Sequence, residues 1–113
     1  MLRITIPSSV KEIEEGAFGV CSAMKEVEFQ SQSSLKKNGP LSFQHCGTLN
    51  QITIPSLVTE IYHDAFQNCT LLEQVTFEIP SSIKLVDKDV FSLCSPNLRI
   101  VNYESINTKC SNA

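Results

Sequence analysis

FQNCTLLEQVTFEIPSSIKLVDKDV, residues 66–90, is the segment that decides how this chain folds. It opens with an FxxC block, Phe66 to Cys69, and the same block starts at Phe18, Phe43 and Phe91. Successive copies are 25, 23 and 25 residues apart. Self-similarity at a period between about 20 and 50 residues is the mark of a stacked repeat protein. The block therefore predicts that the chain folds as a series of similar coils.

After each FxxC block, apolar residues return at matched positions. A long apolar residue follows each cysteine, a second comes about three residues later, and a third two residues after that. The three sets are Met24, Leu49, Leu72 and Leu98; Val27, Ile52, Val75 and Val101; and Phe29, Ile54, Phe77 and Tyr103, with Met1, Ile4 and Ile6 in the same register at the N-terminus. Because neighbouring side chains of a strand point to opposite faces, this alternation predicts one short strand with a buried face in every copy.

Between the strand and the next FxxC block, three copies share a proline motif. It reads IPSSV at 6–10, IPSLV at 54–58 and IPSSI at 79–83. Proline cannot donate a ladder hydrogen bond, so each motif is expected to end its strand. The segments VKEI (10–13), VTEI (58–61) and IKLV (83–86) are expected to form a second short strand on another side of the coil. The AFxxC stretch is too short for a full helix, and one helical or 3₁₀ turn is expected there.

The second copy departs from the others. It has QSQSS at 30–34 in place of the proline motif, Asn38 where isoleucine is expected, and the pair Gly39-Pro40. A single unit cannot bury its apolar face alone, so the period predicts a solenoid in which stacked copies share one core. Five parallel strands at a spacing of about 4.8 Å would span about 20 Å along its axis.

The unit FxxCxxLxxIxIPSSVxxIxxxAF resembles the BspA-like subclass of leucine-rich repeats over about residues 1–103, as about four coils plus a final strand. The resemblance implies a right-handed superhelix with short parallel β-strands on its concave face. The departures are the second copy, the extra residue in CSPNL (94–98) and a C-terminal tail, 104–113, that carries no repeat. Family members are often surface proteins implicated in adhesion, which implies a binding role at a cell surface. The family shares no catalytic residues, so neither enzyme activity nor a cofactor is implied.

Composition narrows the classes of partner. The chain has 113 residues, of which 42% are hydrophobic and 19% charged, and its net charge is −3. A nucleic-acid partner would need a dense Lys/Arg face, so none is expected. No apolar run approaches the ~18 residues of a spanning helix, so no membrane insertion is expected. The start, MLRITIPSSVKEI, does not resemble a signal peptide, which keeps a cytoplasmic location open beside the cell surface.

Four of the five cysteines recur once per copy, as Cys21, Cys46, Cys69 and Cys94. Buried thiols that pack as small apolar groups and donate weakly to turn carbonyls explain such a column. Disulfides between coils or a metal site are the alternative, although zinc sites show paired CxxC spacing. His45 directly precedes Cys46, but its counterparts are Val20, Asn68 and Leu93, so the repeat does not require a Cys–His pair. No catalytic residue, metal ligand or cofactor is therefore expected.

Polar residues lie between the apolar positions of the strands and are expected to face outward. One column is Arg3, Glu26, Gln51, Gln74 and Ile100; the next is Thr5, Glu28, Thr53, Thr76 and Asn102; Lys25, Asn50, Glu73 and Arg99 border them. Solenoids commonly bind partners through such surfaces, whereas an ordinary solvated face is the alternative. The partner-binding candidates are Arg3, Glu26, Glu28, Gln51, Thr53, Gln74 and Thr76, for a protein or glycan ligand.

Three hypotheses about function remain at this point. The first is a non-catalytic adhesion module, the second an intracellular scaffold or regulatory fragment, and the third a thiol- or metal-dependent protein. Met1 falls at the leucine position of a repeat, and only ten residues follow the last strand. Solenoids normally carry polar capping repeats, and uncapped coils offer unpaired strand edges. The chain is therefore expected either to be part of a longer repeat protein or to associate end to end.

Overall fold

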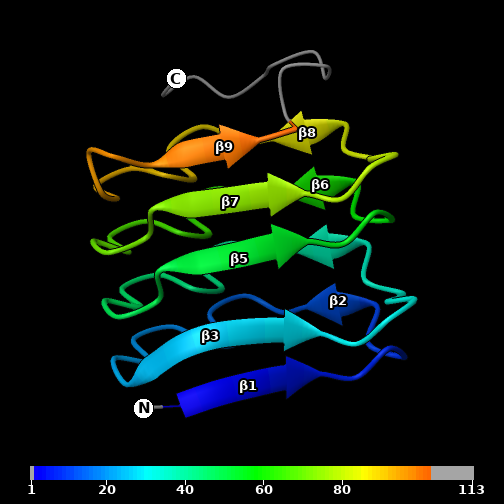
Figure 1. Ribbon diagram of the computed structural model, residues 1–113, viewed down its shortest axis with the longest axis horizontal. Helices are drawn as coiled ribbons and strands as arrows, with labels where there is room; N and C mark the ends of the chain where they lie inside the picture. The colour runs from blue at the N-terminus through cyan, green and yellow to red at the C-terminus, as the bar shows by residue number, and fades with distance from the viewer. Residues whose placement is uncertain (1, 103–113) are drawn as a thin grey trace.

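The computed structural model describes residues 2–102 as a stack of coils that alternate between two parallel sheets (Figure 1). The strands are β1 (Leu2–Ile6), β2 (Glu12–Ile13), β3 (Met24–Phe29), β4 (Lys37–Asn38), β5 (Gln51–Ile54), β6 (Glu60–Ile61), β7 (Gln74–Phe77), β8 (Leu85–Val86) and β9 (Arg99–Val101). One sheet has the order β1-β3-β5-β7-β9 and the other β2-β4-β6-β8. The predicted β-solenoid and its second row of short strands are confirmed. The tail at 104–113 lies outside the described residues.

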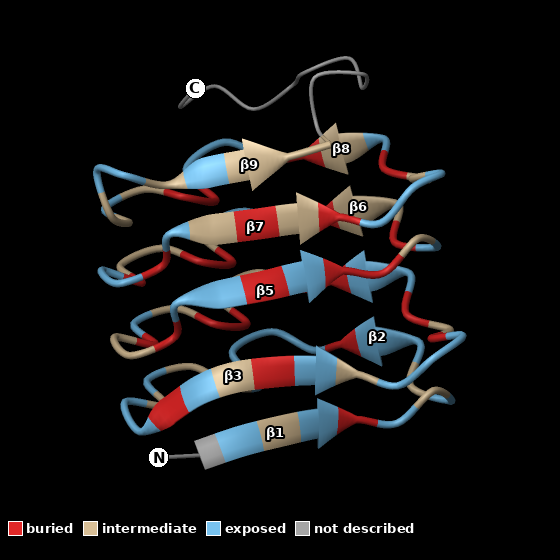
Figure 2. Cartoon of the chain, in the orientation of Figure 1, coloured by how far each residue is buried: buried red, intermediate tan, exposed pale blue. Residues whose placement is uncertain are grey.

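The core lies between the two sheets and is built from the predicted apolar columns. Along β5, buried residues alternate with exposed ones (Figure 2). Met24 at the start of β3, and Leu49 and Leu72 two residues before β5 and β7, are fully buried. The second sheet contributes Ile13, Ile61 and Val86, which are also buried. Each strand thus supplies one or two side chains to a core that runs without interruption along the stack.

The FxxC phenylalanines form a continuous ring stack on a third side of the coil. Ring centroids are 5.3 Å apart from Phe18 to Phe43, 5.3 Å from Phe43 to Phe66 and 5.7 Å from Phe66 to Phe91. The two central rings, Phe43 and Phe66, are completely buried. Because identical residues meet at every coil interface, the ring column sets a common phase for all of the coils.

The AFxxC stretch forms hydrogen-bonded turns, and no helix occurs within residues 2–102, so the expected helical or 3₁₀ turn is wrong. Backbone N–H groups there alternate in direction. The Phe66 and Asn68 N–H groups donate to Val90 and Ser92 in the next coil, whereas Gln67 donates within its own turn. A 3₁₀ helix would direct all of these groups along its own axis. Left-handed residues at Asp64 (φ 58°) and Asn68 (φ 64°) produce the alternation.

The register of the last strand also differs from the expectation. Arg99 pairs with Gln74, Ile100 with Val75 and Val101 with Thr76. Ile100 therefore packs against the core, and Arg99 takes the outward position that we expected for Ile100. The extra residue of CSPNL lies before the strand. It is offset there, because Ile100 comes two positions after Leu98, whereas Val75 comes three positions after Leu72. The coil keeps its length of 25 residues and so stays in register with β7.

The irregular second copy is completed by a buried polar pair. Asn38 in β4 occupies the position of Ile13 and Ile61, and its Oδ1 accepts a hydrogen bond of 2.8 Å from Ser42 Oγ. Both residues are buried, Asn38 at 3% exposure and Ser42 at 0%. Leu35, with 2% exposure, fills the apolar position that the QSQSS segment left unassigned. The copy therefore folds as a full coil.

Loop lengths after the long strands alternate, so two coils form the larger repeating unit. Val10 and Val58 come four positions after Ile6 and Ile54, whereas Leu35 and Ile83 come six positions after Phe29 and Phe77. Each long-loop coil binds the short-loop coil before it in the same way. The side-chain oxygen of Gln30 accepts from Ser8 N at 3.0 Å, and that of Glu78 accepts from Ser56 N at 3.1 Å. The boundary between two such units falls between β3 and β5.

Candidate functional site

The seven candidate residues lie together on the outer face of the five-stranded sheet, in two neighbouring columns. Arg3, Glu26, Gln51 and Gln74 are successive partners across β1, β3, β5 and β7. Thr53 pairs with Thr76, and Glu28 with Thr5. All seven are exposed or half-buried, and they alternate with buried residues such as Val27 and Ile52. That they contact a partner remains a prediction.

Polar contacts divide this face into two ends and a free middle. At the N-terminal end, Arg3 Nε lies 2.8 Å from Glu26 Oε1 and its Nη1 3.7 Å from Glu28 Oε1. At the other end, Arg99 Nη2 donates to Gln74 Oε1 at 2.8 Å. The Gln74 amide in turn donates to Thr76 Oγ1 at 3.1 Å. Arg99, which sequence reasoning placed at the border, is thus a member of the face.

An open groove of about 850 Å³ lies over β3 and β5, at the boundary between the two-coil units. Its apolar lining consists of Val27, Phe29, Ile52, Pro55 and Leu57. Its charged lining consists of Arg3, Glu26, Glu28 and Glu78. Five of the seven candidate residues therefore border one depression, which the apolar spacing did not predict.

The groove follows from how β3 and β5 pair. Among the described residues, their register consists of the single pair Glu26 and Gln51, whereas β5 and β7 share four pairs. Figure 1 shows the corresponding wider gap between β3 and β5. Gln30 N and Glu78 N donate to the preceding strand, to Ile6 O and Ile54 O, but Pro55 occupies their position and has no N–H.

Thr48 holds the two units together at the opposite end of these strands. Its hydroxyl lies 2.9 Å from the Ser22 carbonyl oxygen and 2.8 Å from that of Met24. The junction is therefore tied before β3 and β5 begin and open after their single pair. This asymmetry gives the groove its position at the C-terminal ends of the strands.

His45 and Cys46 do not form a catalytic pair, because their side chains contact different coils. Cys46 Sγ donates to the Phe18 carbonyl of the preceding coil at 3.2 Å. His45 Nε2 lies 3.5 Å from Asn68 Nδ2 of the following coil. The same thiol bond recurs from Cys69 to Phe43 and from Cys94 to Phe66, both at 3.1 Å. The predicted thiol-to-carbonyl contact is confirmed.

The four described thiols are free, and three of them have a raised pKa. The hydrogen bond with Cys69 lowers the pKa of Cys46, but this side chain is completely buried. Cys46 and Cys69 are fully buried, and Cys21 and Cys94 are half-buried. The adjacent Cys46 side chain and burial raise the pKa of the Cys69 thiol, and burial raises the pKa of Cys94 to about 11. A thiol with a raised pKa holds little of the reactive thiolate at neutral pH. Within residues 2–102, no three His, Cys, Asp or Glu side chains gather where they could hold a metal ion.

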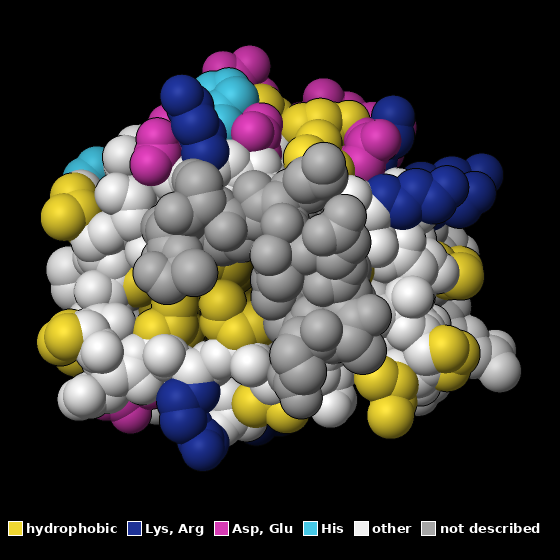
Figure 3. All heavy atoms as spheres, turned by 90° about the horizontal axis from the view of Figure 1, so that it is seen from above, with side chains coloured by type: hydrophobic (Ala, Val, Ile, Leu, Met, Phe, Trp, Pro, Cys, Tyr) yellow, Lys and Arg dark blue, Asp and Glu magenta, His cyan; other side chains and the backbone are white. Residues whose placement is uncertain are grey.

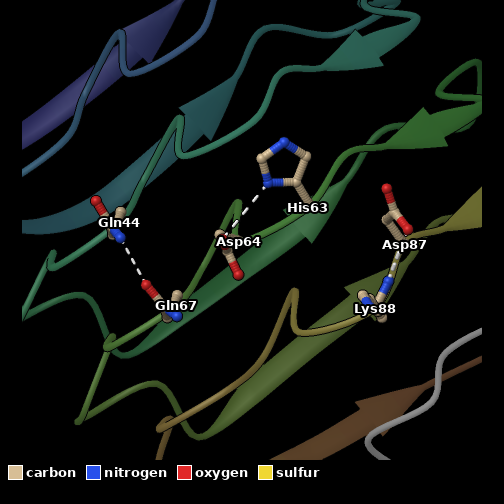
Figure 4. Close-up of polar contacts among 6 residues, drawn as sticks. All are labelled: Gln44, His63, Asp64, Gln67, Asp87 and Lys88. Atoms are coloured by element: carbon tan, nitrogen blue, oxygen red, sulfur yellow. Dashed lines mark hydrogen bonds and ion pairs between the residues drawn. The ribbon is translucent and has the colours of Figure 1, made fainter.

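The remaining polar contacts on the turns are local. His63 Nδ1 lies 3.5 Å from the neighbouring Asp64 carboxylate, and Gln44 donates to Gln67 of the next coil at 2.6 Å (Figure 4). Asp87 accepts from its neighbour's backbone, Lys88 N, at 2.9 Å. These contacts join adjacent residues or adjacent coils, and the partner of His63 is a carboxylate, not a cysteine.

In the view down on the end of the stack that carries β9, charged side chains of both signs lie around the rim (Figure 3). Figure 3 shows Lys, Arg, Asp and Glu side chains beside one another along one side of this view. The expected end-to-end association stays a prediction, because residues 1 and 103–113 lie outside the described part of the chain.

A family model for the BspA type leucine-rich repeat region matches residues 1–113, with six copies. The chain belongs to the BspA type leucine-rich repeat family. The resemblance drawn from the FxxC unit is therefore confirmed. A search of curated proteins finds no match. Within residues 2–102, no helix is long and apolar enough to cross a membrane.

Two solved structures have the same fold. The pneumococcal vaccine antigen PcpA is 26% identical, with a TM-score of 0.78 over 88% of this chain. A leucine-rich cell surface protein from Faecalibacterium prausnitzii is 34% identical, with a TM-score of 0.73 over 95% of this chain. This BspA type repeat chain covers 26% of each of those two chains.

Proposed function

We propose that this BspA type repeat chain is a non-catalytic adhesion or protein-interaction module, and that its outer sheet face binds a protein or glycan at a cell surface. The observation that carries the proposal is the gathering of all seven candidate side chains in two columns over β1, β3, β5 and β7. The two structural neighbours, an antigen and a cell surface protein, support the location.

The mechanism is the presentation of polar side chains on a rigid support. The strands are held by hydrogen bonds on three sides of each coil and by a continuous core, so the face is ordered before a partner arrives. A preformed face loses little conformational entropy on binding, which favours affinity. Exposed Gln and Thr side chains at the centre of the face, Gln51 and Thr53, supply both donors and acceptors.

Binding of the purified chain to intact source cells tests the proposal. The double variant Glu26→Gln/Glu28→Gln should bind less than the wild type, because it removes two carboxylates from the face. Glu14→Gln/Glu15→Gln is the matched control, since it removes two exposed carboxylates between the second sheet and the FxxC turn. Equal binding by both variants, with the folds intact, would exclude the β3 part of the sheet face as the binding surface.

Free thiols favour a second candidate, an intracellular scaffold that uses the same face. Cys21, Cys46, Cys69 and Cys94 are all unpaired, as is usual in a reducing compartment. Surface labelling of intact cells separates the two locations. Labelling of this protein supports the adhesion role, whereas an unlabelled protein beside a labelled surface control supports the scaffold.

A further inference from the structure

The geometry points to a narrower site within the proposed binding face. We propose that the groove between β3 and β5 holds an extended peptide segment of the partner in which apolar and basic side chains alternate. The inference rests on the proposed function, because it assigns a partner chemistry and a position to the same face. Three independent features of the groove support it: its floor, its incompletely paired main chain and its charge.

The floor of the groove exposes part of the core. Phe29 is half-buried there, whereas the residues at the same position in the other long strands, Ile6, Ile54 and Phe77, are 5%, 3% and 1% exposed. On the rim, the Leu57 side chain is 47% exposed. An apolar side chain inserted between Phe29 and Leu57 would remove both from water, which is favourable in proportion to the area covered.

The main chain between the two strands is incompletely paired. Beyond the pair Glu26 and Gln51, residues 27–29 of β3 and 52–54 of β5 have no partner in each other's register. On its other side each strand is paired, β3 with β1 and β5 with β7. Because Pro55 has no N–H, the bonds that Gln30 N and Glu78 N make to the strand before them have no counterpart at Phe29 O. An extended peptide can supply main-chain donors at such a place, while its alternate side chains enter pockets and give specificity. A glycan has no comparable repeating backbone.

The charge of the groove selects basic side chains. Three carboxylates, of Glu26, Glu28 and Glu78, and one guanidinium, of Arg3, line it, which gives a net charge of −2. The Glu28 side chain is 60% exposed and lies 3.7 Å from Arg3, so it remains accessible to a second cation. In an extended peptide, residues beside the inserted apolar ones face the rim, where these carboxylates lie.

Direct binding of a defined peptide tests the proposal. The probe is a fluorescent peptide of about eight residues that alternates valine and lysine, which spans about 26 Å when extended. We expect saturable binding that weakens as salt is added, and no binding of the matching valine–glutamate peptide. Hydrogen exchange of the amides at 27–29 and 52–54 should slow when the valine–lysine peptide binds.

Two matched pairs of variants locate the bound peptide. Glu28→Gln/Glu78→Gln should weaken binding about tenfold. The glutamine oxygen in Glu78→Gln can keep the bond to Ser56 N, as the Gln30 side chain does with Ser8 N. Leu57→Ser should weaken binding by about fivefold to tenfold through lost apolar contact. The controls are Glu14→Gln/Glu15→Gln and Leu71→Ser, because Leu71 is 53% exposed and lies outside the groove. Both should bind as the wild type does.

The outcomes separate this proposal from the broader function. Absence of peptide binding, or equal binding by groove variants and controls, would overturn the peptide groove. Retention of a glycan in a glycan array, lost in Glu26→Gln/Glu28→Gln but not in Leu57→Ser, would also overturn it while supporting the sheet face. Loss of cell binding in Leu57→Ser together with loss of peptide binding would support both.

Discussion

Val20, His45, Asn68 and Leu93 share one backbone conformation although their side chains have little in common. Their φ angles are 60°, 62°, 64° and 61°. Each follows a residue of the FxxC turn that bonds within the turn, and the N–H groups of Val20, His45 and Asn68 donate to the next coil. Asparagine tolerates the left-handed region, whereas a β-branched residue there is strained. The histidine of the His45-Cys46 pair is therefore one solution to a backbone requirement.

Replacing Val20 with asparagine should stabilise the protein. The Val20 side chain is 68% exposed, so little packing is lost, and the strain of a left-handed valine is relieved. We expect Val20→Asn to raise the free energy of unfolding by about 1 kcal/mol in urea denaturation. Leu71→Asn is the control, because it removes an apolar side chain that is also more than half exposed, at 53%, from a residue without positive φ. It should change stability by less than about 0.5 kcal/mol. Equal effects would show that exposure, not backbone strain, is responsible.

The β4 coil differs from its neighbours because a polar pair replaces an apolar one. Ile13, Ile61 and Val86 precede Ala17, Ala65 and Val90 by four residues, whereas here Asn38 precedes Ser42. A buried hydrogen bond contributes little net stability when it is made but costs more when one partner is left without it. Asn38 and Ser42 are therefore tolerated in the core only as a pair.

A double-mutant cycle at Asn38 and Ser42 should show strong coupling. Asn38→Val and Ser42→Ala should each destabilise the protein by about 1–2 kcal/mol, because each leaves a buried polar group unpaired. The double variant has apolar residues at both positions, as the β8 coil has with Val86 and Val90. Its stability should match or exceed that of the wild type. Urea denaturation of the four proteins measures the coupling. Strictly additive losses would contradict this account of the coil.

Gly39 allows β4 to lie close to the coil before it. A Cβ atom there would lie 2.6 Å from the Ile13 carbonyl oxygen and 3.0 Å from the Glu14 carbonyl carbon. Gly39 N donates to that same Ile13 oxygen at 2.8 Å. The backbone itself must therefore move if any side chain is added at this position.

Substitution by alanine should distinguish Gly39 from Gly47. Gly39→Ala should destabilise the protein by about 2 kcal/mol or more, because the strained contact is with backbone atoms. Gly47→Ala meets nothing within 4 Å and should be neutral or slightly stabilising through reduced entropy of the unfolded chain. Thermal unfolding of the two variants and the wild type measures the difference in stability. A similar loss in both would mean that flexibility, not space, is required at Gly39.

Along the stack, the thiols of Cys46, Cys69 and Cys94 each donate to the phenylalanine carbonyl of the preceding coil. Burial opposes ionisation of a thiol in the folded protein, and the pKa of Cys94 is raised from about 9 to about 11. The pKa values of Cys21 and Cys69 are also raised, whereas the hydrogen bond with Cys69 lowers the pKa of Cys46. The unfolded chain ionises these groups near their ordinary pKa, so the two states bind different numbers of protons at alkaline pH.

Stability should therefore fall at alkaline pH. The contribution of Cys94 to the free energy of unfolding is fully present below about pH 9 and is lost as pH rises through about 11, because the unfolded state releases the thiol proton first. Urea denaturation at pH 8 and at pH 10.5 measures the difference. Cys94→Ala, although less stable in absolute terms, should show a smaller loss between the two pH values. An unchanged loss in this variant would assign the pH dependence to other groups.

The spacing of apolar residues was enough to predict the coils, the two rows of strands and the outward position of the seven candidate residues. These features depend on local alternation and on repetition, both of which can be read along one chain. The turn conformation and the register of β9 could not be predicted in this way. They depend on bonds to the next coil and on a constant coil length, which only the stacked neighbours impose.

The groove illustrates the same division at the candidate site. The printed sequence contains Pro55, Thr48 and the alternating loop lengths, but nothing in it says which coils they separate. Only after folding does Pro55 face β3 without an N–H to offer, while Thr48 ties the opposite end of the junction. Local periodicity therefore determined the solenoid and its polar face. The opening between β3 and β5 arises from hydrogen bonds that two separate coils make or fail to make.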